Sequence, residues 1–265
     1  MWFNRAALKA EARACMRFSK ASPYVTALIY ALISYVLSQL SLRLLFPSEY
    51  FYISVDYYRG VEVYVSPYLF ERILYEPFAY LINFLIDMAS LMLSAGMVIF
   101  ALNAAKRAET SIGNLFDGFA QFLRIFLLSL IEGVFVFLWG LLFIIPGIVA
   151  AYRYRLAIYL LLDHPEMRVM DCIRESKRLM SGHKGELFVL DLSFFGWMLL
   201  SSIPYLGIAV SVYVTPYMEI TRAGFYLAVT GADSRGDPGG RYGSEYGRTR
   251  SYEERYRRRG DDNDE

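Results

Sequence analysis

Six charged side chains of this sequence lie inside long apolar segments, where a charge is costly and is kept for a structural or functional reason. Carboxylates in such places can bind cations or carry protons, and arginines can pair with them between neighbouring helices. Two interpretations stay open: a site for an ion or a proton-coupled solute, and structural ion pairs that fix the register of the helices. The residues of this candidate intramembrane polar site are Asp87, Glu132, Arg153, Arg155, Asp191 and Glu219.

No residue spacing typical of a catalytic site occurs in this sequence. The sequence contains no phosphate-binding P-loop, no Gly-x-Ser-x-Gly elbow, no His-Glu-x-x-His helix and no Cys-x-x-Cys pair. His164 and His183 have no neighbouring ligands in the sequence, and Cys15 and Cys172 lie far apart, so neither pair predicts a metal centre or a disulfide. We therefore expect a protein that is not an enzyme and that uses no cofactor and no metal.

The elements that carry these charges have the composition of a membrane protein. Hydrophobic residues make up 56% of the chain, above the roughly 45–50% of soluble domains. The apolar stretch 122–162 is 41 residues long, which as a helix is roughly twice the bilayer core of about 30 Å. It must therefore contain two spans, and we expect the chain to reverse at Pro146 and Gly147, because proline interrupts a helix and glycine adopts turn dihedrals.

We predict an all-α, polytopic membrane helix bundle with about six transmembrane helices. Part of it is duplicated: Trp139 precedes Pro146 by seven residues, Trp197 precedes Pro204 by seven, and Gly-Ile follows each proline. The predicted hairpin turns are Pro146 and Gly147 in the first copy and Pro204 and Gly207 in the second. The predicted spans cover residues 24–46, 78–102, 122–145, 148–162, 187–203 and 208–229.

The duplication brings the candidate polar residues together. If the two hairpins share one orientation, Asp87, Glu132 and Asp191 can converge on the interior of the bundle with Arg153 or Arg155. Arg153 and Arg155 are two positions apart and therefore about 200° apart around a helix. Only one of the two arginines can then face a given partner.

The distribution of lysines and arginines predicts on which side of the membrane each segment between the spans lies. Only Arg43, Arg59 and Arg72 of the 27 lysines and arginines lie near or in the loop after the first span, whereas most of the others fall in segments that must share the opposite side. We therefore expect both termini in the cytoplasm of a plasma-membrane protein. Its predicted parts are a basic amphipathic surface helix at 1–22, the membrane domain at 23–229, an outside loop at 47–77 with a short β-hairpin, a cytoplasmic helix at 163–185, and a disordered Arg/Gly/Tyr/acid-rich tail at 230–265.

The first helix predicts a lipid partner. Arg5, Lys9, Arg13 and Arg17 form a basic sector that suits anionic lipid head groups. The apolar sector beside it contains Phe3, Ala7, Ala10, Ala14 and Phe18 and is expected to face the membrane. The lipid bilayer is the principal expected partner; a membrane or cytoplasmic protein partner is allowed, and a nucleic-acid partner is not expected.

Several motifs occur in an order that resembles a known family. They are SIGNLFDGF at 111–119, LWGLLFIIPGIVAAYRY at 138–154, SKRLMSGHKGELF at 176–188, LDLSFFGW at 190–197 and TPYMEITRAGFY at 215–226. Together they are similar to an uncharacterised family of multi-pass membrane proteins of Gram-positive bacteria, and more distantly to the membrane region attached to some glycerophosphodiester phosphodiesterases. The resemblance implies a membrane-embedded helical fold and brings no catalytic residues with it.

The sequence is compatible with two functions of different classes. The first is a membrane-embedded interaction or accessory module that uses the packed bundle, the amphipathic helices and the tail. The second is a small transporter or channel that uses the intramembrane acidic residues. Reconstituted solute flux distinguishes the second from the first.

Overall fold

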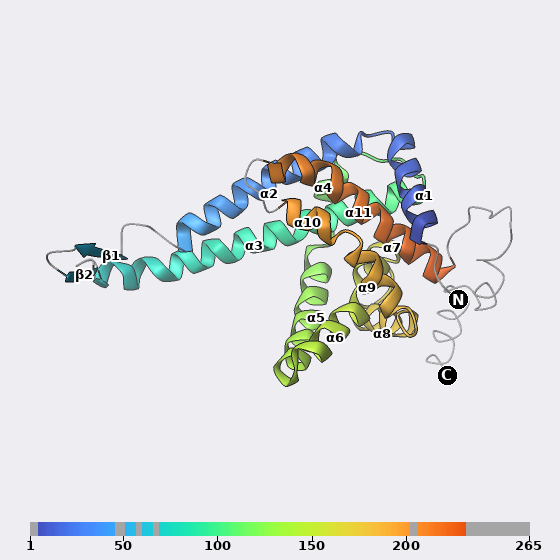
Figure 1. Ribbon diagram of the computed structural model, residues 1–265. Coiled ribbons are helices and arrows are strands. Elements are labelled where there is room, and N and C mark those ends of the chain that lie inside the picture. Colours follow the sequence, from blue (N-terminus) through green and yellow to red (C-terminus); the bar gives the residue numbers. More distant parts are fainter. Residues whose placement is uncertain (1–4, 46–50, 57–59, 66–68, 202–205, 232–265) are drawn as a thin grey trace.

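The computed structural model describes residues 5–45, 51–56, 60–65, 69–201 and 206–231, which are predominantly helical (Figure 1). Four helical segments of this described part are long and apolar enough to cross a membrane. They are Pro23–Leu44, Pro77–Ala105, Asn114–Leu142 and Ile144–Asp163, and they correspond to the first four predicted spans. The predicted helical membrane class is supported, while the total of six spans stays a prediction.

The first hairpin consists of two long helices that lead away from the rest of the molecule (Figure 1). Helix α2 (Pro23–Leu45) and helix α3 (Leu69–Ala105) pack side by side. At their far end strands β1 (Phe51–Asp56) and β2 (Gly60–Val65) pair antiparallel. The alternating pattern of this segment therefore correctly predicted the small β-hairpin.

Polar side chains connect the two helices of this hairpin. The Tyr30 hydroxyl on α2 lies 3.3 Å from the Ser94 hydroxyl on α3, and Ser41 Oγ donates to Asn83 Oδ1 at 2.5 Å. Tyr30 and Ser41 are eleven residues apart on α2, as are Asn83 and Ser94 on α3, so each pair forms a polar stripe along one face of its helix. Small polar residues on facing helices allow close packing and cross-helix hydrogen bonds, so each stripe supplies contacts to the other.

The second hairpin reverses three residues before the predicted turn. Helix α5 (Phe122–Leu142) ends at Phe143, whose backbone is extended, with φ −159° and ψ 150°, and helix α6 (Ile144–Tyr154) starts immediately afterwards. Pro146 is thus the third residue of α6. The prediction of a turn at Pro146–Gly147 was wrong because proline is tolerated in the first turn of a helix, where its missing N–H would have had no intrahelical partner.

Gly147 has a packing role in place of the predicted turn role. A Cβ atom at this position would lie 2.8 Å from the Cα atom of Gly140 on α5. No side chain fits at such a distance, so the two glycines allow the backbones of α5 and α6 to approach closely. Sequence reasoning selected the right residue of this hairpin for the wrong reason.

The remaining helices surround the inner ends of the two hairpins (Figure 1). The predicted fifth span, residues 187–203, is divided at Ser193 and Phe194, where the Ser193 hydroxyl donates to the carbonyl of Leu190 and offers the backbone an alternative to a continuous helix. Pro204 lies outside the described residues. A Cβ at Gly207 would lie 2.1 Å from the Ser201 carbonyl oxygen, so this glycine also serves close helix contact. The helices are α4 (Asn114–Asp117), the 3₁₀ helix η1 (Gly118–Gln121), α7 (Ala157–Asp163), α8 (Val169–Leu179), α9 (Lys184–Leu192), α10 (Phe195–Ser201) and α11 (Leu206–Thr230).

The N-terminal helix α1 (Arg5–Phe18) packs on protein with a different face from the predicted apolar one. Its buried residues are Leu8, Ala12, Cys15 and Met16, and the helix contacts α11 and α3. Ala7, Ala10 and Phe18 are exposed instead. Burial of Leu8 and Met16 on protein leaves this sector exposed, and its predicted contact with the membrane stays a prediction. Helix α1 is part of the bundle and contributes to its core.

Candidate functional site

One buried arginine organises the charged residues of the bundle interior. Arg222 on α11 donates from Nε to Asp191 Oδ1 at 2.9 Å and from Nη1 to Glu219 Oε1 at 2.8 Å. Its side chain is only 8% exposed. Glu219 lies three residues earlier on α11, a spacing at which opposite charges pair along a helix. The second partner, Asp191, comes from α9, so the arginine joins two helices.

Two tyrosines complete the coordination of these carboxylates. Tyr152 on α6 donates its hydroxyl to Asp191 Oδ2 at 3.2 Å, and Tyr159 on α7 donates to Glu219 Oε2 at 3.1 Å. Both oxygens of each carboxylate therefore accept a hydrogen bond. A buried carboxylate with all its oxygens used is held in one geometry, so this cluster fixes α6, α7, α9 and α11 relative to one another.

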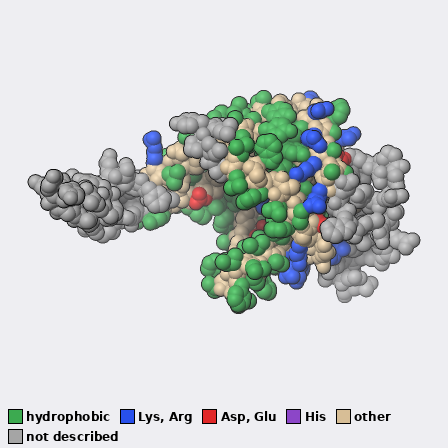
Figure 2. Space-filling view, in the orientation of Figure 1, with side chains coloured by type: hydrophobic (Ala, Val, Ile, Leu, Met, Phe, Trp, Pro, Cys, Tyr) green, Lys and Arg blue, Asp and Glu red, His purple; other side chains and the backbone are tan. Residues whose placement is uncertain are grey.

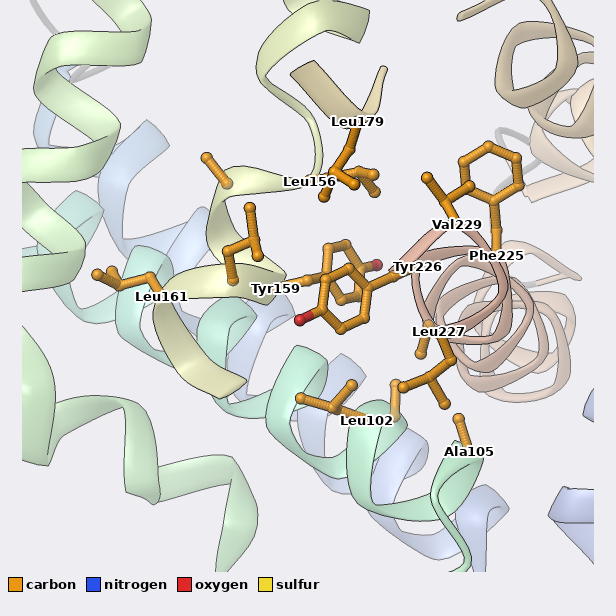
Figure 3. Close-up of a cluster of buried hydrophobic side chains, with 14 of the residues drawn as sticks. Leu102, Ala105, Leu156, Tyr159, Leu161, Leu179, Phe225, Tyr226, Leu227 and Val229 are labelled. Atoms are coloured by element: carbon orange, nitrogen blue, oxygen red, sulfur yellow. The ribbon is translucent and has the colours of Figure 1, made fainter. Parts of the chain in front are cut away.

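A stacked tyrosine pair continues this network towards the end of α7. The rings of Tyr159 and Tyr226 stack with centroids 5.6 Å apart, and their hydroxyls point in opposite directions (Figure 3). Tyr226 donates to Asp163 Oδ2 at 2.9 Å, and Asp163 is also paired with Lys106 at the end of α3. Both tyrosines are buried among the leucines of the core. The core of the protein thus contains a stacked aromatic pair whose two hydroxyls each donate to a different carboxylate.

A cavity of about 350 Å³ lies beside this network, where α2, α3, α5, α7 and α11 meet. Two of the predicted residues, Glu132 on α5 and Arg155 between α6 and α7, line it together with Glu219. Glu132 Oε1 is buried and has no hydrogen-bond partner among the described residues. The other polar side chains of the wall are hydroxyls, from Tyr30, Ser94, Ser129, Tyr159 and Thr215.

The structure leaves two of the predicted residues outside the cavity. Asp87 on α3 is exposed and accepts a hydrogen bond from Asn83 Nδ2 at 3.1 Å. Arg153 is half-buried, and its backbone carbonyl accepts from Ser176 Oγ at 3.0 Å. Arg155 alone of the two arginines lines the cavity, as their angular separation on a helix requires. Asp191 joins the site through Arg222 and does not line the cavity.

Sequence reasoning missed three contributors to the site: Arg222, Tyr152 and Tyr159. Arg222 was counted among the cytoplasmic positive charges and left out of the candidate site, although its spacing allows it to pair with Glu219 along the helix. Tyr152 and Tyr159 are seven residues apart, which places them on one face of the α6–α7 segment. A tyrosine in an apolar segment brings a hydroxyl that needs a partner, and this signal was available in the sequence.

The two histidines have local roles. His164 Nδ1 lies 3.2 Å from Glu166 Oε1, and His183 Nδ1 lies 2.8 Å from Glu186 Oε2. Within the described ranges of the chain, no group of three or more His, Cys, Asp or Glu side chains is arranged to hold a metal ion.

Basic side chains gather on the side of the molecule formed by α1 and α8, whereas apolar side chains cover the α5–α6 hairpin (Figure 2). On α1, Arg5, Arg13 and Arg17 are exposed. Lys9 is half-buried, with Nζ 4.3 Å from the ring centroid of Phe194. Burial, together with the neighbouring Arg5 and Arg13, lowers the pKa of Lys9. Three of the four predicted cations of α1 are therefore free to meet a charged surface, and Lys9 supports the packing of the helix.

The tip of the α5–α6 hairpin is apolar and open. Leu141, Leu142, Phe143, Ile144 and Ile145 are between 62% and 79% exposed. Contiguous apolar exposure of this kind marks a surface that meets lipid or another apolar partner.

Comparison with known proteins agrees with part of the sequence resemblance. Residues 141–233 match a family described as "Protein of unknown function (DUF975)". The match begins in the α5–α6 hairpin and ends just after α11, so it includes Arg155, Asp191, Glu219 and Arg222. No curated protein and no solved structure matches the chain. A Gram-positive source and a likeness to the phosphodiesterase membrane region stay predictions, and over residues 141–233 the chain is similar to a family of unknown function.

Proposed function

We propose that this protein is an integral protein of the plasma membrane that crosses it about six times, with both termini in the cytoplasm, and acts as a membrane-embedded interaction or accessory module. The four apolar helices support insertion in a membrane. The basic side formed by α1 and α8 supports a cytoplasmic position for that face, since lysine and arginine accumulate on the inner side.

The observation that carries the accessory role is the closed ion-pair cluster at Arg222. Asp191 and Glu219 are both satisfied within the chain by Arg222, Tyr152 and Tyr159. Charges that are fully paired in this way hold helices in register and are not available to bind an ion in transit. This favours the structural interpretation for this half of the predicted polar site.

Affinity purification of the full chain in mild detergent tests the accessory role. We expect a protein partner to co-purify at constant stoichiometry and to be lost when Arg174 and Lys177, two exposed cations of α8, are both changed to glutamate. The variant Asp87→Asn is the matched control, because Asp87 lies on α3 away from that surface and its loss should leave the partner bound. Solute flux in reconstituted vesicles, without any retained partner, would contradict the accessory role.

A second candidate is a small transporter or channel, and the cavity at Glu132 favours it. Glu132 is the predicted acid whose carboxylate is left with an unpartnered buried oxygen. In this case vesicles should show solute or proton flux that Glu132→Gln abolishes and Asp87→Asn preserves.

We further propose that α1 contacts anionic lipid head groups through Arg5, Arg13 and Arg17. Each cation near an anionic surface contributes about 1 kcal/mol, and the attraction is screened by salt.

A further inference from the structure

The cavity between α2, α3, α5, α7 and α11 is lined by an acidic side chain and an arginine that do not pair with each other. Glu132 Oε1 is buried without a hydrogen-bond partner, and Arg155 lines the same cavity. No ion pair or hydrogen bond joins Arg155 to an acid among the described residues, although its charge is within electrostatic range of Glu132. By contrast Glu219, the other acid on the cavity wall, is already held by Arg222 and Tyr159.

A buried carboxylate oxygen without a donor loses its hydration and gains nothing in return, so a ligand that supplies an N–H donor is favoured there. The guanidinium of Arg155 favours an anionic group, because its fork of N–H donors matches carboxylate and phosphate oxygens. A single ligand that carries both groups satisfies both side chains.

The size of the cavity selects a small organic ligand. About 350 Å³ lies at the lower end of the range of about 300–1,000 Å³ found for small-molecule sites. It is roughly ten times the share of about 30 Å³ that one water occupies, so a single water or bare ion does not fill it. Hydroxyls of Ser94, Ser129 and Thr215 on the wall can accept further hydrogen bonds from an amine.

We propose that this cavity binds a zwitterionic amine, whose protonated primary amine donates to Glu132 and whose anionic group binds Arg155. The same chemistry is found in a free amino acid or phosphoethanolamine and in the head group of an ethanolamine phospholipid. The proposal requires only the folded bundle and does not depend on whether a protein partner binds or a solute is transported.

Thermal unfolding of the full-length protein in phosphatidylcholine nanodiscs tests the proposal. Three probes are added separately: glycine in solution, phosphoethanolamine in solution, and phosphatidylethanolamine within the nanodisc. We expect at least one probe to raise the unfolding temperature of the wild type in a saturable manner. Stabilisation by phosphatidylethanolamine alone identifies a lipid source, and stabilisation by a dissolved probe identifies a soluble one. Phosphocholine, which has no N–H donor, should bind about tenfold more weakly than phosphoethanolamine.

Single substitutions test the proposed contacts of the ligand with Glu132 and Arg155. Glu132→Gln and Arg155→Gln should each weaken binding about tenfold or more, the effect of losing a hydrogen bond to a charged group. Arg153→Gln and Asp87→Asn are the matched controls, because neither residue lines the cavity, and both should bind as the wild type does. Arg155 is exposed, so its variant keeps the test valid even if Glu132→Gln folds poorly. The proposal is overturned if no probe stabilises the wild type, if phosphocholine binds as well as phosphoethanolamine, or if Arg155→Gln responds like Arg153→Gln.

Discussion

At the scale of single residues, the bundle interior separates its charges into two groups. Arg222, Asp191 and Glu219 satisfy one another with the help of two tyrosine hydroxyls, and this closed group belongs to the packing of the protein. Glu132 and Arg155 line a cavity in which each still needs a partner. The first group explains why the helices hold their register, and the second is where a ligand would act.

Loss of Arg222 should be among the most damaging single changes. Arg222→Met leaves two buried carboxylates without their cation, and breaking a buried pair from one side costs about 3–5 kcal/mol. We expect a large fall in the thermal unfolding midpoint in detergent. Arg174→Met on the exposed face of α8 is the matched control and should change the midpoint little, since surface ion pairs contribute about 0–1 kcal/mol. Equal effects of the two variants would contradict the structural role of Arg222.

Cys172 on α8 supplies a pH-dependent probe of folding. Burial raises the pKa of this thiol to about 11, against the opposing effect of Arg124. A raised pKa means that the neutral thiol favours the folded state, so this contribution to stability is present below the unfolded pKa of about 8.5 and is lost as the pH rises towards 11.

Thiol labelling tests the burial that raises the pKa of Cys172. In the folded protein we expect Cys172 to resist a maleimide near neutral pH and to react on unfolding. A Cys172→Ala chain carrying Ser181→Cys is the comparison, because Ser181 is exposed and its replacement should react at once. Equally fast labelling at both positions would show that Cys172 is accessible.

At the scale of helices, glycines allow the backbones of neighbouring helices to approach closely. The chain reverses at Phe143, and Gly147 and Gly140 bring α5 and α6 together. A similar contact occurs between α3 and the segment after it, where a Cβ on Gly96 would lie 2.0 Å from the carbonyl oxygen of Leu115. This contact gives the glycines a packing role that a list of turn-forming residues does not predict.

Substitution of Gly147 should separate the two helices of the hairpin. Gly147→Ala places a Cβ where the Gly140 backbone already lies, and overpacking of this kind costs typically about 1–3 kcal/mol. Gly133→Ala on α5 is the matched control: nothing lies within 4 Å of its added Cβ, and alanine favours a helix by about 1 kcal/mol. Unfolding midpoints in detergent should move in opposite directions. A Gly147→Ala protein as stable as the Gly133→Ala protein would contradict close packing of α5 on α6.

The sequence predicted the secondary-structure elements better than the contacts between them. Apolar length located the first four candidate spans, and alternation located the β1–β2 hairpin, because both are properties of local segments. The partners of Asp191 could not be predicted, because they depend on how α6, α9 and α11 meet across the bundle, and the exposure of Asp87 depends on which face of α3 the other helices cover. The face of α1 that packs on protein was not predicted either, since it depends on the protein surface that receives the helix.

At the scale of the whole molecule, charge and apolar surface lie on different parts of the protein. Lysines and arginines gather near α1 and α8, and the α2–α3 hairpin leads away to the β1–β2 hairpin (Figures 1 and 2). This separation supports a bundle inserted in a membrane with its basic side in the cytoplasm and the β-hairpin on the opposite side.

Accessibility of single cysteines in intact cells tests this central claim most directly. In a chain with Cys15 and Cys172 changed to alanine, Ser54→Cys places a thiol in β1 and Ser181→Cys places one between α8 and α9. A membrane-impermeant maleimide should label the Ser54→Cys protein in intact cells and the Ser181→Cys protein only after permeabilisation. Labelling of both proteins in intact cells, or of the Ser181→Cys protein alone, would contradict the proposed orientation.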